Sequence, residues 1–433
     1  MLPPSDEVYL MGNPPFVGAR MMAAGSVQKT DMANVFDGWK NFGNLDYVCA
    51  WYKKAADYMA GTRICAAFVS IKSVTQGDTP ATLWKPLFER GIKIFFAHHT
   101  FKWSSESKNE AAVYCVIVGF SYAPSKKKAL YTDGQPQEVT HINAYLIDAP
   151  DIFVESRSKP LCDVPEIGIG NKPIDGGNYL FTEEERDAFL KLEPKAKKYF
   201  KTWYDGKGFL YNKPRYCLWL GDCPPNELMA MPLCKKRVAA VREYRLNSPS
   251  AGTRKIADTP TRFHVENMPK GNYIVIPEVT SSSRRYIPIG FLDDKNLCSN
   301  KLRIIPSVML YHFGILTSNV HMAWMRVTSC RLGDGYSYSN TIVYNNFPFP
   351  TPTDEQRATI EQTAQAILDA RALYPESSLA DLYDVNAMPK ELREAHRAND
   401  RAVMKAYKMP TKTSEAEAVA LLMARYEILT AKK

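Results

Sequence analysis

The stretch Val8-Tyr9-Leu10-Met11-Gly12-Asn13-Pro14-Pro15-Phe16 decides the fold. Its first four residues form a short apolar run, and the run stops at a glycine followed by an asparagine and two prolines. Because proline removes a backbone donor and fixes φ, we expect a strand that ends near Gly12. Ligands of doubly wound sheets lie outside the carboxyl ends of strands, which is where Asn13, Pro14, Pro15 and Phe16 fall.

The residues that follow alternate between helix and strand patterns. Apolar residues at helical spacing predict helices over residues 45–59 and 80–90. Continuous apolar runs predict buried strands over residues 63–69, 91–97 and 111–120. Strands that alternate with helices favour an open α/β sheet.

The rest of the chain changes character twice. A polar segment near residues 121–137 indicates a loop or a domain boundary, and residues 138–350 look mixed and loop-rich, with strand-like runs at 273–276 and 341–344. Prolines at 348, 350 and 352 then end that region. Beyond them the spacing predicts three helices, over 353–374, 389–407 and 414–430.

Length and composition exclude several classes of protein. A chain of 433 residues suggests two to four domains, and 45% hydrophobic with 23% charged residues is typical of a globular chain. No apolar run of 18 residues or secretory signal is present, so we expect no membrane span. The nine cysteines are scattered and odd in number, which favours reduced thiols in a cytoplasm over disulfides or a metal site.

The excess of positive charge is concentrated in one segment. Residues 195–255 hold fourteen Lys/Arg against four Asp/Glu, a balance of +10, whereas the whole chain carries +9. Such a segment indicates a surface for a polyanion, most simply nucleic acid. A solvated basic face without function is the alternative, because the interleaved aromatic residues suit a core as well as base stacking.

The tetrapeptide 13–16 indicates a methyltransferase that acts on an exocyclic amine. The amide oxygen of Asn13 and the backbone carbonyl of Pro14 can each accept one N–H of such an amine. Held in this way, the nitrogen moves toward tetrahedral geometry and its lone pair becomes available to a sulfonium methyl. Phe16 offers a stacking face for a base that has left the duplex. The alternative is a proline-rich turn that only ends a strand.

Several longer motifs resemble the adenine-specific DNA methyltransferases of the MmeI-like fused restriction–modification family. The resemblance covers essentially the whole chain. It is carried by residues 12–18 (GNPPFVG), Gln28-Lys29-x-Asp31-Met32, 45–55 (LDYVCAWYKKA), 96–104 (FAHHTFKWS), 212–220 (NKPRYCLWL), 282–288 (SSRRYIP), 343–348 (VYNNFP), and 378–383 (SLADLY) with Met388-Pro389.

This resemblance implies a partial Rossmann-like methyltransferase sheet in residues 1–135. A mixed α+β target-recognition domain over 136–350 and a C-terminal helical domain over 351–433 follow. The family's nuclease segment and its cofactor-binding half, with a glycine-rich turn, should precede the catalytic tetrapeptide, yet only twelve residues do so here. We therefore expect the S-adenosylmethionine pocket to be incomplete and a second chain to supply the missing segments, unless the chain is a truncation or fragment.

The resemblance also suggests residues that contact DNA. Phe101 or Trp103 would form a second wall for the flipped adenine. Arginines that read base edges or clamp phosphates are expected at Arg284, Arg285, Arg326 and Arg331. Phosphate contacts are expected from residues of the basic segment, namely Lys235, Lys236, Arg237, Arg242 and Arg245. Ordinary core packing and solvated surface charge are the alternatives for these sets, and His98 and His99 lack a third ligand that would make them a metal site.

Two other functions stay open. A DNA-recognition module without activity of its own would explain the absence of the cofactor half. A methyltransferase acting on a protein glutamine would use the same loop, but such an enzyme has no need of a charge of +10 in 61 residues. The recognised DNA sequence and the oligomeric state cannot be read from one chain.

Overall fold

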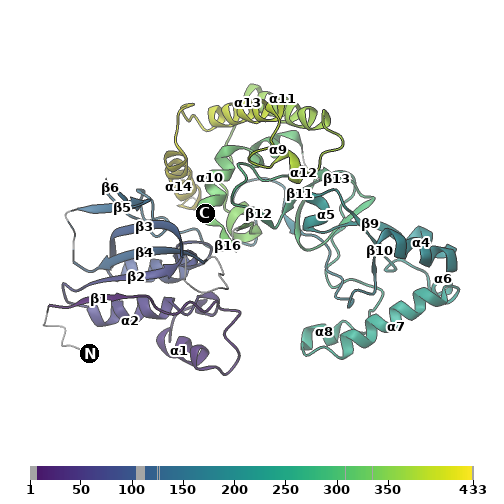
Figure 1. Ribbon diagram of the computed structural model, residues 1–433, viewed down its shortest axis with the longest axis horizontal. Coiled ribbons are helices and arrows are strands. Elements are labelled where there is room, and N and C mark those ends of the chain that lie inside the picture. Colours follow the sequence, from purple (N-terminus) through teal and green to yellow (C-terminus); the bar gives the residue numbers. More distant parts are fainter. Residues whose placement is uncertain are drawn as a thin grey trace. The chain divides into compact units, whose positions relative to one another are not determined.

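The computed structural model describes residues 7–103, 113–123, 125, 127–307, 309–333 and 335–431, without the side chains of Lys102 and Trp103. The chain forms two compact units that interleave along the sequence (Figure 1). Unit 1 consists of residues 1–162, 323–350 and 409–433, and unit 2 of residues 163–322 and 351–408. The sequence analysis expects three consecutive domains instead, and that division stays a prediction.

A mixed sheet forms the centre of unit 1, with the strand order β1-β2-β4-β3-β5-β6. β1 and β2 are parallel, as are β3 and β5, whereas β4 runs antiparallel to both β2 and β3. The carboxyl ends of β1, β2, β3 and β5 therefore meet at one edge of the sheet. The strands are β1 (Tyr9–Gly12), β2 (Cys65–Ile71), β3 (Lys93–Trp103), β4 (Val113–Ser121), β5 (Lys128–Thr132) and β6 (Gln135–Val139).

Helical segments cover one face of this sheet, and an aromatic cluster joins the two layers. The ring of Tyr52 lies 5.1 Å from that of Trp84 and 5.3 Å from that of Phe68. Trp84 donates its indole N–H to the carbonyl of Val74 at 2.8 Å, so its polar group is satisfied inside the core. The segments are α1 (Val27–Val35), η1 (Phe42–Asn44), α2 (Cys49–Met59), η2 (Lys72–Thr75), the π-helical η3 (Pro80–Trp84) and α3 (Lys85–Glu89).

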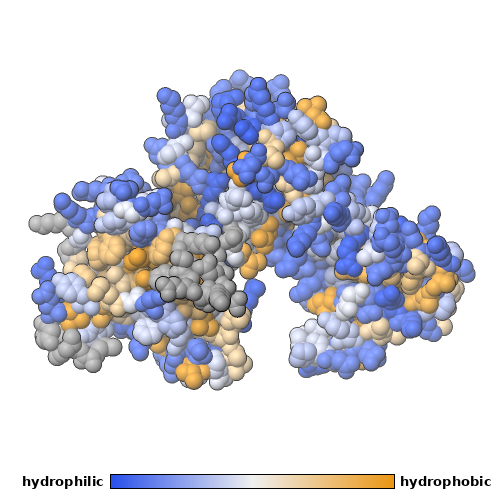
Figure 2. Space-filling view, viewed as in Figure 1, coloured by the Kyte–Doolittle hydropathy of each residue, from blue (hydrophilic) through white to orange (hydrophobic). Residues whose placement is uncertain are grey.

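The opposite face of the sheet is only half-buried. Along β2 the side chains alternate between buried and half-exposed, and the half-exposed ones include Ala67, Val69 and Ile71. Figure 2 shows apolar surface over the strands of unit 1. Because apolar side chains remain half-exposed on this face, it has the character of a surface that packs against further polypeptide.

The segment 121–137 is not simply a loop, as the sequence analysis expected. It contains the whole of β5, which forms an antiparallel hairpin with β6. The turn consists of Asp133 and Gly134, both with positive φ (50° and 78°). An Asp-Gly pair is the usual turn of a two-residue hairpin. The three lysines at residues 126–128 make the segment polar in composition, so the Asp-Gly turn signal was overlooked.

The strand expected at residues 341–344 is a π-helical turn, η5 (Asn340–Tyr344). The carboxamide of Asn346 stabilises this turn, because its Nδ2 donates to the carbonyls of Thr341 and Ile342 and to that of Glu155. Arg157 donates to the Oδ1 of the same side chain at 3.2 Å. The β-branched run 341–343 thus follows a tertiary hydrogen-bond network rather than its intrinsic preference for strand.

Unit 2 contains two small sheets. One has the order β14-β9-β10-β8, and the other β13-β11-β15-β7. The predicted strand 273–276 is confirmed as β11, which is buried along its whole length. The strands are β7 (Gly168–Ile169), β8 (Leu180–Phe181), β9 (Phe200–Tyr204), β10 (Arg215–Leu218), β11 (Tyr273–Pro277), β13 (Gly290–Leu292), β14 (Asn296–Cys298) and β15 (Leu302–Pro306), and β12 (Val279–Ser281) follows β11. In unit 1, β16 (Cys330–Leu332) pairs with β17 (Gly335–Ser337).

The three helices expected near the C-terminus are confirmed within two residues at each end, as α11 (Asp354–Ala372), α13 (Lys390–Ala406) and α14 (Glu415–Ala431). A capping box at Thr353 and Gln356 begins α11. α14 belongs to unit 1, where its Tyr426 ring packs on Trp324. The other helices are α4 (Glu183–Leu192), η4 (Pro194–Tyr199), α5 (Gly206–Leu210), α6 (Pro225–Met229), α7 (Pro232–Leu246), α8 (Ala251–Lys255), α9 (Leu310–Leu316), α10 (Asn319–Thr328) and α12 (Leu379–Leu382).

Gly314 lets α9 approach α11 and α13 closely. A Cβ at this position would stand 2.7 Å from Ile360 and 3.1 Å from the Oδ1 of Asn399. The Nδ2 of Asn399 donates to the Gly314 carbonyl at 2.8 Å. These contacts hold the three helices together as one layer of unit 2.

A single arginine organises the loops beside α7. Arg245 is fully buried, and its guanidinium donates five hydrogen bonds to backbone carbonyls at 2.7–2.9 Å. The acceptors lie in two loops that are distant in sequence. They are the carbonyls of Pro173 and Ile174 and those of Ile256, Thr259 and Arg262. A planar guanidinium with five donors reaches both loops at once. Two of the carbonyls also accept a backbone N–H, that of Ile256 from Thr259 and that of Thr259 from Arg262.

We predict that Arg245→Lys lowers the free energy of unfolding by about 1–3 kcal/mol, because an ammonium is a single point that cannot reach both loops, so at least one buried carbonyl loses its donor. The control is Arg242→Lys on the same helix, whose side chain is 54% exposed. Urea denaturation followed by tryptophan fluorescence measures both. Equal midpoints for the two variants would contradict the assigned role of Arg245.

Candidate functional site

The tetrapeptide 13–16 lies where the sequence analysis expects it, directly after β1. The last residue of β1, Gly12, pairs with Phe68 of the parallel strand β2. Asn13 is exposed and its side chain makes no hydrogen bond with another described residue, so its amide oxygen is open to a substrate. Pro14 is buried, Pro15 is exposed, and Phe16 is half-buried against the core.

A buried carboxylate fixes the chain just after this loop. The Oδ1 of Asp46, which is 8% exposed, accepts hydrogen bonds from the backbone N–H groups of Val17 at 3.2 Å and Val48 at 3.0 Å. The N–H of Tyr47 donates in turn to the Val17 carbonyl at 3.0 Å. Burial raises the pKa of Asp46, and the two N–H donors oppose that rise. Asp46 thus positions the loop, a role that the sequence analysis did not assign.

The same segment also ties down α1. The phenol of Tyr47 donates to the Oδ2 of Asp31 in α1 at 2.6 Å. Ser26 is the N-cap of this helix, and its hydroxyl accepts the N–H of Lys29. The motifs around residues 28–32 and 45–48 therefore act together, and what they hold is the chain that follows Phe16.

The outer edge of β1 has no partner strand among the described residues, since β1 is the end strand of its sheet. Tyr9 is 65% exposed and Met11 is 81% exposed. A short edge strand with large exposed apolar side chains offers a row of unpaired backbone groups to a further strand. This edge adjoins the Asn13 loop.

The two predicted stacking residues lie on β3. The ring of Phe101 packs edge-on against His98, with ring centres 5.3 Å apart. Trp103 ends the strand, and its side chain lies outside the described residues. Three steps of about 4.8 Å separate β1 from β3 in the sheet, so a base between Phe16 and Phe101 requires the loop to reach across. The stacking role stays a prediction.

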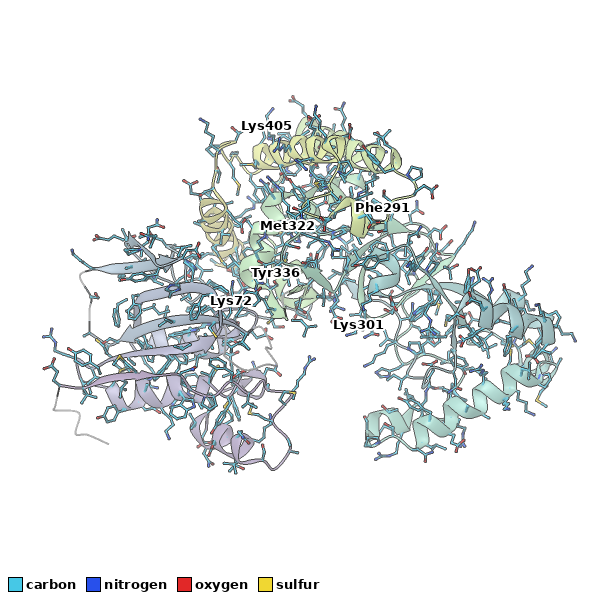
Figure 3. All side chains as sticks on the ribbon, viewed as in Figure 1. Lys72, Phe291, Lys301, Met322, Tyr336 and Lys405 are labelled. Carbon is cyan, nitrogen blue, oxygen red and sulfur yellow. The ribbon has the colours of Figure 1, made fainter. Side chains whose placement is uncertain are left out.

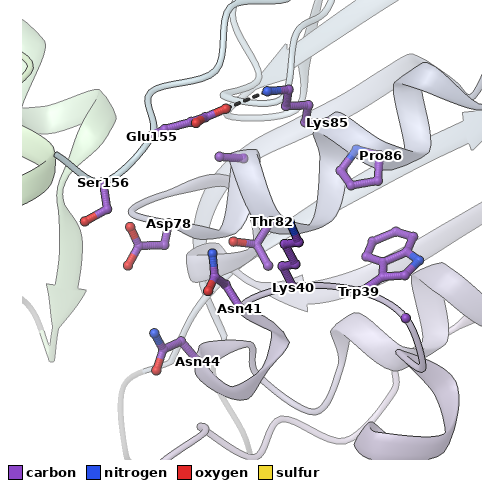
Figure 4. A pocket seen from close by; sticks show the side chains of 12 residues that line it. Trp39, Lys40, Asn41, Asn44, Asp78, Thr82, Lys85, Pro86, Glu155 and Ser156 are labelled. Carbon is purple, nitrogen blue, oxygen red and sulfur yellow. Dashed lines mark hydrogen bonds and ion pairs between the residues drawn. The ribbon is translucent and has the colours of Figure 1, made fainter.

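Another cavity of unit 1 lies away from this loop. Its volume is about 690 Å³, and Figure 4 shows that its lining mixes amides with charges of both signs, including Asn41, Asp78 and the ion pair of Lys85 with Glu155. None of the residues 13–16 lines it. Because opposite charges neutralise each other there, the cavity has no electrostatic preference for an anion or a cation.

The basic segment is only partly a surface. Lys235, Lys236 and Arg242 are exposed on α7, and the Arg237 guanidinium lies 4.8 Å from the ring centre of Phe181. The expectation that Arg245 contacts phosphate is wrong, because its guanidinium is fully buried.

The predicted arginine readers fall into two different environments. Arg284 and Arg285 follow β12; Arg284 is half-buried and Arg285 is exposed, 5.5 Å from the ring centre of Tyr286. The hydroxyl of Tyr286 donates to the buried Asp400 of α13 at 2.7 Å, which anchors the segment that carries both arginines.

Arg326 and Arg331 belong to unit 1. Arg326 pairs with Glu415 of α14 at 2.6 Å, and the Arg331 guanidinium lies 4.3 Å from the ring centre of Tyr336 and 5.2 Å from that of Tyr114. Both are half-buried and line or adjoin a smaller cavity that also contains Lys72. The sequence analysis missed Lys72, although its place directly after β2 was a signal of the same kind as that of Asn13.

Two searches of the described part of the chain are negative. No group of three or more His, Cys, Asp or Glu side chains is placed to hold a metal ion. No helix is both long and apolar enough to cross a lipid bilayer.

Comparisons with known proteins cover nearly the whole chain. The family models described as MmeI DNA-methyltransferase domain, MmeI target recognition domain and MmeI C-terminal domain match residues 2–132, 148–351 and 352–432. A protein of Bacillus subtilis (strain 168) named DNA methyltransferase A is 38% identical over 427 residues, which are 98% of this chain and 48% of that protein. The chain thus spans about half the length of the curated relative it matches.

A solved structure agrees with the fold. The type IIL restriction–modification enzyme MmeI in complex with DNA matches with a TM-score of 0.92 and 42% sequence identity, over 98% of this chain and 57% of that one. This match confirms the predicted fold class, an α/β methyltransferase-type sheet with a mixed α+β region and C-terminal helices. On these grounds the chain belongs to the MmeI family of restriction–modification proteins.

Proposed function

We propose that the chain is the part of an adenine-N6 DNA methyltransferase that contains the catalytic loop and recognises the DNA target. The observation that carries the proposal is the loop 13–16 at the carboxyl end of β1, with an exposed amide at Asn13 and a backbone anchored through Asp46. The family membership reported above supports the same reaction class.

The loop can hold an amine by both of its hydrogens. The Oδ1 of Asn13 and the carbonyl of Pro14 each accept one N–H, which withdraws the nitrogen lone pair from the adenine ring. Acceptors fixed before the reaction stabilise the charge that develops on the nitrogen. The two prolines and the Asp46 contacts keep the acceptors in place, since they restrict the backbone on either side. The flipped adenine would stack on Phe16, and Phe101 or Trp103 would form the second wall.

S-adenosylmethionine, the family's methyl donor, does not fit this chain by itself. The first hundred residues contain no G-x-G turn, and the edge of β1 beside the loop is unpaired within the described residues. The open edge and the half-covered sheet face support a partner chain or a further segment of the same protein that brings the cofactor-binding and nuclease parts.

Double-stranded DNA is the proposed macromolecular partner. The exposed cations of α7, namely Lys235, Lys236 and Arg242 with Arg237 beside them, would contact phosphates. Arg284 and Arg285 stand on a polar loop and are the proposed readers of base edges. A cytoplasmic site of action stays a prediction from the cysteine content.

The runner-up is a recognition module without activity, which the open edge of β1 also allows. Methyl transfer in the presence of the complementary half separates the two, because a pure recognition module binds DNA and never transfers a methyl group.

The first prediction concerns the loop. With the complementary half of the enzyme added, Asn13→Ala should reduce methyl transfer to duplex DNA by at least a hundredfold, since one of two acceptors is lost. Phe16→Ala should be milder, because it removes stacking only. Asn34→Ala, at an exposed position of α1, is the matched control. Transfer of labelled methyl groups measures the rate, and full activity of Asn13→Ala would refute the mechanism.

The second prediction concerns α7. Reversal of its charges in Lys235→Glu/Lys236→Glu/Arg237→Glu should weaken binding to all duplex sequences alike and flatten the slope of log affinity against log salt by about 0.9 per lost phosphate contact. Lys390→Glu/Arg397→Glu/Lys405→Glu reverses three exposed cations of α13 as the control. Fluorescence anisotropy at several salt concentrations gives both slopes. Identical slopes for the two triple variants would remove α7 from the interface.

The third prediction tests whether Arg284 and Arg285 contact base edges or phosphates. Arg284→Ala and Arg285→Ala should alter which base pair is preferred, by roughly 1–3 kcal/mol at one position of the site. Selection of bound duplexes from a randomised pool, followed by sequencing, reports the preference. An equal loss of affinity for every duplex would show that these two arginines contact phosphate instead.

A further inference from the structure

The cavity that contains Lys72 is lined by residues near the carboxyl ends of β2 and β3, the same end of the sheet at which the Asn13 loop follows β1. Its volume is about 190 Å³. Lys72 and Gln76 come from the segment after β2, and His99 and Thr100 from β3. The pairing of β3 with β4 shifts register between His98 and Phe101, so the two β3 residues lie in a bulge. Such a bulge re-aims side chains at the edge of a sheet.

The lining is cationic. Lys72 is half-buried and forms no ion pair with a carboxylate of the described chain, and Arg326 enters from α10. Arg331 lies near Lys72 on the neighbouring hairpin. Against these charges stands one carboxylate, Glu415, which pairs with Arg326. Figure 3 shows Lys72 and Tyr336 close together at this place, and both line the cavity.

Burial without a counter-charge makes Lys72 costly to ionise. Burial, and then the nearby guanidinium of Arg331, lower the pKa of Lys72 to about 8. The pKa of His99 is lowered as well, first by burial and then by the charge of Lys72. A half-buried ammonium beside other cations is unfavourable for the isolated chain, and an anion in the cavity removes that cost.

One buried group of the cavity also lacks a partner. Gln76 is 2% exposed, its Nε2 donates to the Arg326 carbonyl at 3.3 Å, and its Oε1 accepts no hydrogen bond from a described residue. Buried side-chain acceptors nearly always have a donor. A nucleotide offers a partner to both groups, since its phosphodiester is an anion for Lys72 and its base edge carries N–H groups for the Oε1 of Gln76.

We propose that this cavity binds a phosphodiester of the DNA strand next to the flipped base, with Lys72 as its main charge contact and Arg326 beside it. The proposal rests on the proposed function, because only a nucleic acid whose target base reaches Asn13 would bring a phosphate to this edge. Lys72 acts here as a positioning residue: it holds the strand and does not touch the reacting amine.

The test is the pH and salt dependence of DNA binding by the whole chain. Bound phosphate keeps Lys72 protonated, so affinity should be constant below about pH 7 and fall toward tenfold per pH unit above pH 8. The groups facing Lys72 are His99, Arg331, Arg326, Glu415, Tyr336 and Tyr145. If one of these groups caused the loss of affinity above pH 8, that loss would remain when Lys72 is replaced.

Three variants make the test specific. Lys72→Met should remove the fall with pH and lower the salt slope by about 0.9, which corresponds to one phosphate. Lys72→Arg should remove the fall with pH but keep the salt slope, because arginine stays charged. Lys93→Met changes a lysine at the opposite end of β3 that pairs with Asp151, and it should retain both behaviours.

The outcomes are distinguishable. If the wild-type chain does not bind duplex DNA, both the proposed function and this inference fail. If it binds but Lys72→Met matches the wild type in salt slope and pH profile, the cavity assignment alone is wrong. Binding of inorganic phosphate that depends on Lys72, with DNA binding unaffected by the substitution, would show a site for a free anion and would also overturn the proposal.

Discussion

The hydrogen bonds from two backbone N–H groups to the Asp46 carboxylate are the interaction on which the candidate site depends. A carboxylate loses solvation when it is buried, and for Asp46 that loss exceeds what the Val17 and Val48 donors return, so its pKa is raised. As a source of stability the contact is therefore weak. Its value is geometric: it fixes the backbone at residue 17, directly after the loop that contains the proposed acceptors Asn13 and Pro14.

Unit 2 uses the same device with the opposite charge. The guanidinium of Arg245 donates to five backbone carbonyls of two loops and so joins these loops inside the unit. Asn346 does the same for the turn 340–344 in unit 1. In each case one polar side chain organises an irregular stretch of backbone. Loops held in this way keep a defined shape, which a surface for a sequence-specific partner requires.

The two cationic regions differ in solvation, and this difference sets what each can contribute. Charges on α7 remain in water, where they attract a polyanion over a distance but discriminate little between sequences. The charge of Lys72 is partly desolvated and lies next to other cations, so it interacts strongly with a phosphate that enters its cavity and weakly with anything outside. In the proposed function, long-range attraction of DNA and local positioning of its strand therefore belong to different residues.

The sequence by itself determined the position of the loop 13–16 after β1, the strands around it, the three C-terminal helices and the family. Each of these depends on a local signal: an apolar run ended by prolines, a helical period, or a continuous motif. Tertiary structure alone decided the rest. In the sequence, Arg245 is one more cation of a basic segment. In the fold, it is buried by the packing of loops 173–174 and 256–262. The β-branched residues 341–343 predict a strand from sequence alone. In the fold they form a helical turn, because Asn346 hydrogen-bonds to it and Arg157 holds the Asn346 side chain. Lys72, His99 and Arg326 converge on one cavity only because the sheet register and α10 bring them together. The physical reason is that burial, desolvation and hydrogen-bond satisfaction depend on contacts between residues far apart in the chain, which no local pattern records.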